Sequence, residues 1–430
     1  MSDRSLKMAE AARRAQRRLG SVPPATRDRV LERLSTLLAE RRGALVDENR
    51  RDLEQAEADG VAAPLLGRLE LSDSKLTTLI EGVDKLAQDR DLLGREVRKT
   101  ELDENLVLSQ VRSPIGVLLI IFESRPDAVI QIGSLALRSG NSVLLKGGAE
   151  ALRSNRALIG CLRDAVAAEG LDADAVQEVE DRRAAQALLE HDRLIDLVIP
   201  RGSNELVRAI QAATKIPVLG HADGVCHLYL DSSADLETAV RLAVDSKCDY
   251  PSACNAVETL LVHRDFLPRF GPVARILTEA GVELRADREA RAFCPQAVAV
   301  AEDDWGREYG ALILAIRTVG DLDEAIDHIH HYGSAHTDAI VAADPEAQRR
   351  FLNNVDSASV FANASTRFAD GFRYGLGAEV GISTGRIHAR GPVGVEGLLT
   401  TRWLLEGSGQ IVGEYGPGKR ALTHRPLPVD

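Results

Sequence analysis

Short apolar runs alternate with amphipathic stretches through the middle of the chain, and this alternation restricts the fold more than any other feature. Val117–Phe122 is typical of a buried strand, Asp127–Leu137 of a helix and Ser142–Leu145 of a second strand. The same alternation resumes near Asp231 and continues to Ala339–Val341. Strands separated by helices favour parallel sheets with helices on both faces. The sequence therefore predicts an α/β fold with two doubly wound units.

The two ends of the chain have a different character. Most of the first ninety residues show apolar positions at helical spacing, such as Val30, Leu34 and Leu38, and are predicted to be helical. Around Leu102–Val111 an alternating pattern predicts strands. From Gly371 onward, frequent glycines indicate tight turns and close approach of backbone segments rather than a further domain.

Composition excludes several classes of protein. A chain of 430 residues is long enough for two or three domains. The net charge of −12 argues against nucleic acid or an anionic membrane as a partner, and no apolar run approaches the ~20 residues of a membrane span. The N-terminal arginines are compatible with a transit peptide, but Asp3 and Glu10 favour an ordinary first helix. Five sparse cysteines indicate reduced thiols, and hence a cytoplasmic protein.

One of these cysteines, Cys254, lies on a turn between a predicted helix and the predicted strand Val257–Val262. Pro251 and Ser252 mark the turn, and small residues on both sides leave the sulfur approachable. Backbone N–H groups beside such a thiol can face a substrate oxygen, which suits covalent acyl chemistry. The alternative is a packing cysteine, but packing cysteines more often lie inside an apolar run, as Cys161 does. Cys254 is therefore the candidate nucleophile.

Three turns follow predicted strands and are candidates for binding a nucleotide. They are Glu123–Pro126, Lys146–Gly148 and Pro200–Ser203. In open parallel sheets, ligands bind at the carboxyl ends of the strands, where such turns lie. Taken singly, each turn is equally compatible with an ordinary strand-to-helix connection, and the chain has neither a GxGxxG sequence nor a Walker lysine. Three turns in one unit favour a dinucleotide-binding domain.

Together these segments resemble the aldehyde dehydrogenase superfamily and, within it, the gamma-glutamyl phosphate reductases. The resemblance is carried by Ile121–Pro126, Leu144–Gly148, Ile199–Glu205, Gly220–His227, Ala253–Ala256 and the run Phe361–Gly397. It implies an aldehyde dehydrogenase-like fold with a cofactor-binding domain at 1–231, to which 362–400 return, and a catalytic domain at 232–361. It also implies that 101–111 and 401–412 pair as a small β flap shared between subunits. An intrachain hairpin that covers the sheet edge is the alternative for the flap.

The resemblance further implies NADPH-dependent reduction of L-glutamyl 5-phosphate to L-glutamate 5-semialdehyde, with release of phosphate, in proline biosynthesis. Cys254 would attack the acyl phosphate to form a thioacyl enzyme, with Asn255 beside it and Ser124 as an oxyanion donor. Ser124 stands where hydrolytic relatives carry an asparagine. The strand Pro217–Gly220 lacks the glutamate with which those relatives activate water. This absence suits a reductase, which must keep water from hydrolysing its thioester. A coenzyme A thioester as acyl donor and a catalytically silent binding homologue remain alternatives.

The remaining candidate residues follow from the same resemblance. It implies NADP as the cofactor, although Glu150 could chelate a ribose diol and favour NAD, or simply be a charge at a helix N-terminus. No metal site is expected, because His328 and His331 share a face at the end of one predicted helix without a carboxylate at ligand spacing, which favours a solvated helix end. The resemblance also implies a homo-oligomer, a dimer or a tetramer, and channelling of the substrate from a separate glutamate 5-kinase. The candidate cofactor-binding residues are Lys146, Gly147, Gly148, Gly202, Ser203 and Glu308. The candidate substrate-binding residues are Arg125, Asn363, Ser365, Thr366, Arg367 and Ser383. For each arginine in this set, an interdomain ion pair is the alternative.

Overall fold

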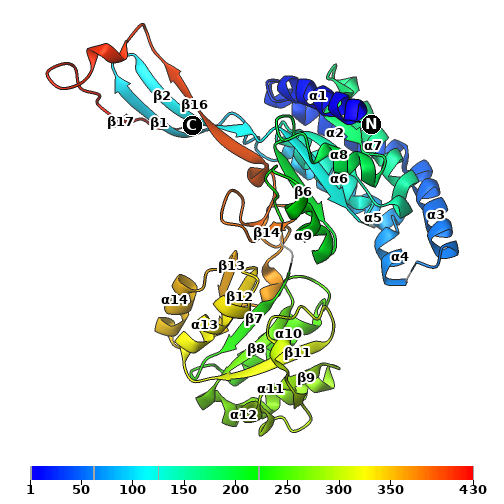
Figure 1. Cartoon of the computed structure of the whole chain (residues 1–430), viewed down its shortest axis with the longest axis vertical. Coiled ribbons are helices and arrows are strands. Elements are labelled where there is room, and N and C mark those ends of the chain that lie inside the picture. Colours follow the sequence, from blue (N-terminus) through cyan, green and yellow to red (C-terminus); the bar gives the residue numbers. More distant parts are fainter. Residues whose placement is uncertain (1, 62, 124, 221–222, 430) are drawn as a thin grey trace.

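Two parallel sheets organise most of the chain, and a third, antiparallel sheet extends away from the first of them (Figure 1). The computed structural model describes residues 2–61, 63–123, 125–220 and 223–429. Each parallel sheet carries helices on both of its faces, so the predicted α/β fold with two doubly wound domains is confirmed. In the described ranges, no helix combines the length and the apolar character needed to cross a membrane.

The sheet of the first domain has the strand order β5-β4-β3-β6, and all its strands are parallel. All six residues of β3 are buried, because they pack against helices on both faces of the sheet. The order reverses between β3 and β6, which makes the carboxyl ends of these two strands the switch point where such sheets bind ligands. The strands are β3 (Val117–Phe122), β4 (Ser142–Lys146), β5 (Val176–Glu178) and β6 (Leu197–Arg201).

Alternate residues of β3 face two different groups of helices. Leu118, Ile120 and Phe122 belong to the larger core, together with helices from the first ninety residues, which are helical as predicted. Val117 and Leu119 belong to a smaller core on the opposite face. The larger core includes residues of α2 (Pro24–Glu40), α3 (Arg42–Ala58), α5 (Asp73–Gln88), α6 (Asp127–Arg138) and α7 (Leu152–Ala168). The smaller core includes residues of α1 (Ser2–Leu19), α8 (Arg182–Leu188) and α9 (Asn204–Ala213), and α4 (Ala63–Leu69) lies beside α3.

The sheet of the second domain is parallel throughout and has the order β10-β9-β11-β8-β7-β12-β13. Its first strand in the sequence, β7 (Cys226–Leu230), hydrogen-bonds to β8 and β12. The change of sheet therefore precedes Cys226 and lies before the boundary at 231 expected from the sequence. The other strands are β8 (Val257–His263), β9 (Glu283–Ala286), β10 (Val298–Ala299), β11 (Ile313–Val319), β12 (Thr337–Val341) and β13 (Ser359–Ala362). The helices are α10 (Leu236–Cys248), α11 (Leu267–Glu279), α12 (Arg288–Arg291), α13 (Leu322–Tyr332) and α14 (Pro345–Asn354).

After β13 the chain returns to the first domain as a glycine-rich segment, which we call the returning run (residues 363–398). It contains the short antiparallel pair β14 (Ile382–Ser383) and β15 (Gly391–Pro392). Val380, Val393 and Leu398 are buried in the larger core of the first domain. Figure 1 shows the run passing between the two domains before it enters the antiparallel sheet. The returning run therefore contacts both domains.

The antiparallel sheet has the order β16-β2-β1-β17. Residues 101–111 span the hairpin between β1 and β2 instead of forming one strand, and Asn105 takes a left-handed conformation (φ 57°) at the turn. β16 pairs with β2 from Leu399↔Pro114 to Glu406↔Val107, and residues 407–412 lie beyond its end. All four strands come from one chain, so a strand added by a second subunit stays a prediction. The strands are β1 (Glu96–Asp103), β2 (Leu106–Pro114), β16 (Leu399–Glu406) and β17 (Arg425–Pro426).

Candidate active site

The turn that carries Cys254 connects the end of α10 to the start of β8. Ala253 N–H donates to the carbonyl of Tyr250 at 3.0 Å, and Ala256 N–H donates to the carbonyl of Ala253 at 2.9 Å, so the turn has its own hydrogen bonds. Cys254 is half-buried. Cys161, Cys226 and Cys294 are buried in the domain cores, and Cys248 is half-buried at the end of α10. The expected separation between a presented thiol and packing thiols is therefore seen for three of the other four cysteines.

Backbone contacts hold the Cys254 turn on two sides. A Cβ placed on Gly224 would lie 2.5 Å from the carbonyl oxygen of Cys254, so only glycine fits there. That carbonyl accepts a hydrogen bond from the Cys226 thiol at 3.2 Å. On the other side, the Asn255 side-chain amide donates to the carbonyl of Ala369 in the returning run at 2.9 Å. Asn255 thus fixes the turn against the returning run, and its own side-chain N–H is engaged away from a substrate.

A buried ion pair joins the two elements that flank the turn. Lys247 Nζ lies 2.5 Å from Glu258 Oε2, and both side chains are at most 1% exposed. The other Glu258 oxygen accepts a hydrogen bond from Gly310 N–H at 3.1 Å. Burial raises the pKa of Glu258 to about 7 and lowers the pKa of Lys247. The pair closes the base of the Cys254 turn and also ties it to the segment that follows Glu308.

The turn after β4 is tightly packed around its glycines. A Cβ on Gly147 would lie 2.1 Å from the side-chain nitrogen of Asn155, and one on Gly148 would lie 2.0 Å from a Glu150 carboxylate oxygen. Lys146, the last residue of β4, is half-buried. The Glu150 carboxylate therefore lies close to the turn that begins with Lys146. A carboxylate that binds a ribose diol of a nucleotide at this turn would have this position. The shape and donors of this turn fit a nucleotide whose phosphate or ribose approaches the backbone closely.

The turn after β6 faces the end of β3 across the switch point. Ser203 N–H donates to Glu123 Oε2 at 3.3 Å, and the Ser203 hydroxyl caps α9 by accepting from Leu206 N–H at 3.4 Å. A Cβ on Gly202 would lie 2.6 Å from the same Glu123 oxygen. The proposed oxyanion donor Ser124 lies outside the described residues. A ligand at this turn would therefore contact its backbone and the adjoining side chains, including the Glu123 carboxylate.

Glu308 connects the second domain to the segment between the domains. Its Oε2 accepts hydrogen bonds from Gly224 N–H at 2.9 Å and from the Asn204 side-chain amide at 3.3 Å. The same Asn204 nitrogen donates to Asp223 Oδ1 at 2.9 Å. Gly224 also contacts Cys254. Glu308 is therefore connected to the turn that carries the thiol through a single residue, Gly224.

Arg201, at the end of β6, was not singled out from the sequence as a site residue. Its Nη1 donates to the carbonyl of Glu379 in the returning run at 3.2 Å. Burial and the neighbouring Arg125 lower the pKa of Arg201, whereas Glu379, Asp127 and the Cys254 thiolate raise it. The end of β6 and the Cys254 turn, which belong to different domains, thus both bond the returning run.

Three of the candidate substrate residues anchor the returning run at the end of α10. Ser365 Oγ accepts a hydrogen bond from the Ser246 hydroxyl at 3.1 Å, and Thr366 N–H donates to that hydroxyl at 3.3 Å. Arg367 Nε lies 3.1 Å from Asp249 Oδ2, which is the ion pair left open as the alternative. A cavity of about 640 Å³ lies beside them, lined by α10, α11 and the returning run, among others by Asp245, Asp249, Arg367 and Arg373.

The other candidate substrate residues lie farther along the chain. Both side-chain amide atoms of Asn363 bond the backbone of Ala342, at 3.0 and 2.9 Å, so this side chain ties β12 to the returning run. Ser383 is buried in β14, opposite Gly391. Arg125 is exposed beyond the end of β3. Among the residues that the structure describes, no group of three or more His, Cys, Asp or Glu side chains is arranged to hold a metal ion.

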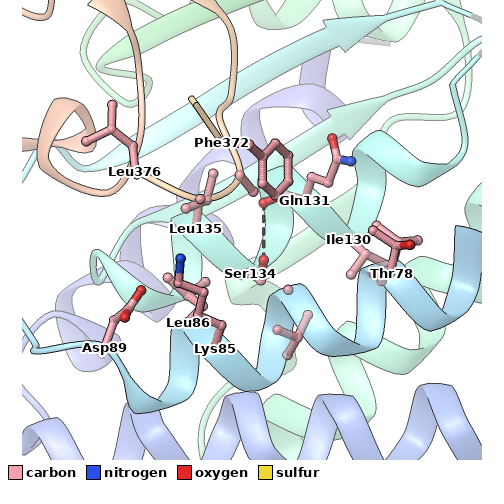
Figure 2. A pocket seen from close by; sticks show the side chains of 15 residues that line it. Thr78, Lys85, Leu86, Asp89, Ile130, Gln131, Ser134, Leu135, Phe372 and Leu376 are labelled. Carbon is pink, nitrogen blue, oxygen red and sulfur yellow. Dashed lines mark hydrogen bonds between the residues drawn. The ribbon is translucent and has the colours of Figure 1, made fainter. Parts of the chain in front are cut away.

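A narrow pocket of about 50 Å³ lies between α5, α6 and the returning run (Figure 2). Phe372 and Leu376 of the run and Leu135 of α6 contribute apolar side chains to its lining. The Ser134 hydroxyl is used within α6, where it donates to the carbonyl of Gln131 at 3.1 Å. This pocket marks where the run docks on the first domain and holds none of the candidate site residues.

Comparison with known proteins agrees with this geometry. Residues 3–286 match the model of the aldehyde dehydrogenase family. Over 425 residues the chain is 51% identical to the gamma-glutamyl phosphate reductase of Prochlorococcus marinus (strain MIT 9303), covering 99% of this chain and 97% of that protein. It is 52% identical over 425 residues to the protein of the same name from Synechococcus sp. (strain CC9605), covering 98% of each. The chain belongs to the gamma-glutamyl phosphate reductases of the aldehyde dehydrogenase family.

A solved gamma-glutamyl phosphate reductase from Thermotoga maritima shares the fold with a TM-score of 0.92 and 36% identity, covering 95% of this chain and 99% of that one. An acetylating aldehyde dehydrogenase from Geobacillus thermoglucosidasius, 18% identical, has a TM-score of 0.65 over 95% of this chain and 98% of that one, which shows the fold alone. The family resemblance inferred from the sequence is therefore confirmed.

Proposed function

We propose that this chain reduces L-glutamyl 5-phosphate to L-glutamate 5-semialdehyde with NADPH, releasing phosphate, as a step of proline biosynthesis. The names of its gamma-glutamyl phosphate reductase relatives support the substrate, and the aldehyde dehydrogenase family supports a nicotinamide cofactor. The observation that carries the proposal is the half-buried Cys254 on a turn that bonds the returning run through Asn255, because the same run accepts a hydrogen bond from Arg201 at the ligand-binding edge of the first sheet. An acyl group held by that thiol would lie beside a cofactor bound at the same edge.

In the proposed reaction the Cys254 thiolate attacks the acyl carbon of the substrate. A C–S bond forms and the C–O bond to phosphate breaks, with the electron pair leaving on the phosphate oxygen. Backbone N–H groups of the turn stabilise the oxyanion, and we assign Ser124 as a further donor. When bound, the nicotinamide supplies the hydride that reduces the thioester. Cys254 is then expelled as thiolate when the carbonyl of the aldehyde forms.

The turns after β4 and β6 would hold the cofactor. Lys146, with Gly147 and Gly148, binds the adenosine ribose or its phosphate, and Gly202 with Ser203 lies near the pyrophosphate. Glu308 would orient the ribose next to the nicotinamide. Its bond to Gly224, which contacts Cys254, supports this role, because it couples the ribose position to the thiol.

A reverse assay tests the function without the labile acyl phosphate. Purified protein is mixed with glutamate semialdehyde, NADP and inorganic phosphate, and the formation of NADPH is followed. We expect reduction of NADP that depends on phosphate and does not occur when coenzyme A replaces it. Turnover with coenzyme A alone would identify a different acylating dehydrogenase, and no turnover with either would leave a binding homologue.

Lys146→Ala is expected to raise the KM for NADPH ~10-fold or more, because a lost charge-assisted hydrogen bond of about 1.5–3 kcal/mol corresponds to that factor. Lys215→Ala, which removes an exposed lysine after α9, is the matched control and should leave the constant unchanged. Steady-state kinetics with NADPH and with NADH measure both the effect and the preference for the 2′-phosphate. A change only in the KM of the glutamyl substrate would assign the turn to the wrong ligand.

We also propose that the antiparallel sheet is an oligomerisation flap of a cytoplasmic dimer or tetramer that receives its substrate from a separate glutamate 5-kinase. β16 is an edge strand with Trp403 51% and Leu405 58% exposed, which suits pairing with a second copy. All five cysteines are free thiols, which suits a reducing compartment.

Light scattering tests the flap. The wild type is expected to have the mass of an oligomer, and a chain truncated before Thr401 to be monomeric, because β16 is then lost. A wild type that is a stable, active monomer, or a truncated chain that keeps the mass of the oligomer, would show that the sheet only covers an intrachain edge.

A further inference from the structure

Arg201 lies at the switch point of the first sheet, where the carboxyl ends of β3 and β6 meet. It pairs with Phe122 across the two strands, and its carbonyl accepts a hydrogen bond from Glu123 N–H at 3.2 Å. We propose that Arg201, together with Arg125, binds the phosphate group of the acyl phosphate and stabilises it as it leaves. This inference rests on the proposed function and assigns one part of its substrate.

The guanidinium of Arg201 has donors to spare. It carries five N–H groups, and within the described ranges only Nη1 makes a hydrogen bond, to the carbonyl of Glu379. No carboxylate in those ranges forms an ion pair with Arg201 or Arg125. By contrast, the buried Arg27 lies 2.7 Å from Asp91. A partly buried guanidinium without a carboxylate is costly unless an anion joins it.

The charges around Arg201 point to a ligand with more than one negative charge. Burial and then repulsion by the charge of Arg125 lower the pKa of Arg201, while Glu379 and Asp127 act in the opposite direction. A phosphate between two guanidinium groups relieves this repulsion, and its oxygens match the planar fork of arginine. The returning run links this site to the sulfur. Glu379, which accepts a hydrogen bond from Arg201, also accepts one from Gly371 N–H at 2.9 Å, and Ala369, two residues before Gly371, accepts one at 2.9 Å from Asn255, next to Cys254.

Three other cations near the turn are already engaged with carboxylates. Arg367 and Arg373 both lie against Asp249, at 3.1 and 3.4 Å. Lys247 is buried in its pair with Glu258. Arg68 acts on Tyr250 of the turn, so among the described residues Arg201 and Arg125 are the cations that we assign to the leaving group at the switch point.

The role is electrostatic and requires no proton transfer. As the thiolate of Cys254 forms the C–S bond, the electron pair of the breaking C–O bond moves onto the phosphate oxygen. The guanidinium of Arg201 compensates the charge that develops there, which favours loss of phosphate over return of the thiolate. In the reverse direction the same group holds inorganic phosphate for attack on the thioester.

Arg201→Gln tests the assignment in the reverse assay, with Arg201→Lys as a charge-preserving variant. Arg275→Gln is the matched control, since Arg275 is an exposed arginine on α11 whose ion pair, among the described residues, is with Glu279. We expect Arg201→Gln to raise the KM for inorganic phosphate about tenfold or more with the KM for NADP within about twofold of wild type. Arg201→Lys should fall between, because it keeps the charge but not the fork.

A second measurement does not need turnover. Inorganic phosphate should slow the alkylation of Cys254 by iodoacetamide in the wild type and in Arg275→Gln, and should give no protection in Arg201→Gln. An increase in the KM for NADP that equals or exceeds that for phosphate, or full phosphate protection in Arg201→Gln, would overturn the assignment. A wild type that forms NADPH without phosphate would instead overturn the proposed function itself.

Discussion

Cys254→Ala is expected to lower turnover by about 10⁴-fold or more while the fold and cofactor binding are retained, because the variant lacks the atom that carries the acyl group. The half-exposed turn tolerates the smaller side chain, since its hydrogen bonds come from the backbone and from Asn255. Cys248→Ala is the matched control: this thiol is also half-buried and lies only six residues earlier. Activity assays and NADPH binding by fluorescence measure the two effects, and full activity in Cys254→Ala would refute a covalent mechanism.

The same thiol should be labelled first by iodoacetamide near neutral pH. Burial raises the pKa of Cys161 and Cys226, and that of Cys294 to about 11, so these thiols stay protonated as well as shielded. Burial also raises the pKa of Cys248. Peptide mass spectrometry after limited alkylation measures the order, and the early appearance of label on another cysteine would contradict it.

The second large effect concerns the buried ion pair beneath the turn. Lys247→Met is expected to destabilise the protein by about 3–5 kcal/mol, because it leaves the Glu258 carboxylate buried without a counter-charge. Glu258→Gln in the same chain removes that carboxylate, so the double variant should recover most of the loss. Urea unfolding followed by circular dichroism measures both.

Arg275→Met is the control for this pair, because it removes an exposed partner of Glu279 and should cost less than about 0.5 kcal/mol. Lys247→Met should also lower activity by a larger factor than the loss of folded protein accounts for. The reason is that the pair also fixes the turn and, through Gly310, the segment after Glu308. If the single and double variants are destabilised equally, the attraction between the two charges adds nothing to the free energy of unfolding beyond the packing of the two side chains.

Much of the fold could be predicted from the sequence, because the spacing of apolar residues in a strongly periodic segment indicates which of its faces are buried. Val117–Phe122 is apolar throughout since both its faces are covered, and the helices of the first ninety residues show the spacing of a one-sided core. Strand β7 was not recognised, because Cys226–Leu230 mixes His227 and Tyr229 with leucines and its polar groups find partners only in the folded sheet. His227 pairs with Asp338 at 2.9 Å, and the Tyr229 hydroxyl with Asp231 at 3.1 Å.

The thiol of the site could be predicted from local sequence, but its supports could not. Lys247 and Glu258 look like ordinary surface charges, and nothing in their spacing shows that the fold buries both. His328 was expected at a solvated helix end, and the structure buries it with its ring edge-on to Trp305, 5.6 Å between centroids. Arg201 lies in the turn Pro200–Ser203 that the sequence indicated, but its own role could not be predicted, because it depends on a thiol 53 positions later in the chain and in the other domain.

The exposed edge of β16 determines how newly made or dilute protein behaves. The strand pairs with β2 on one side only, and its free side carries backbone donors and acceptors beside Trp403 and Leu405. An unassembled chain offers this edge to any extended segment it meets, including the same strand of a misfolded copy. In the proposed oligomer, overexpression faster than assembly should therefore yield insoluble material, and the apparent melting temperature should rise with protein concentration. A charged substitution such as Leu405→Lys would then improve solubility at the expense of assembly.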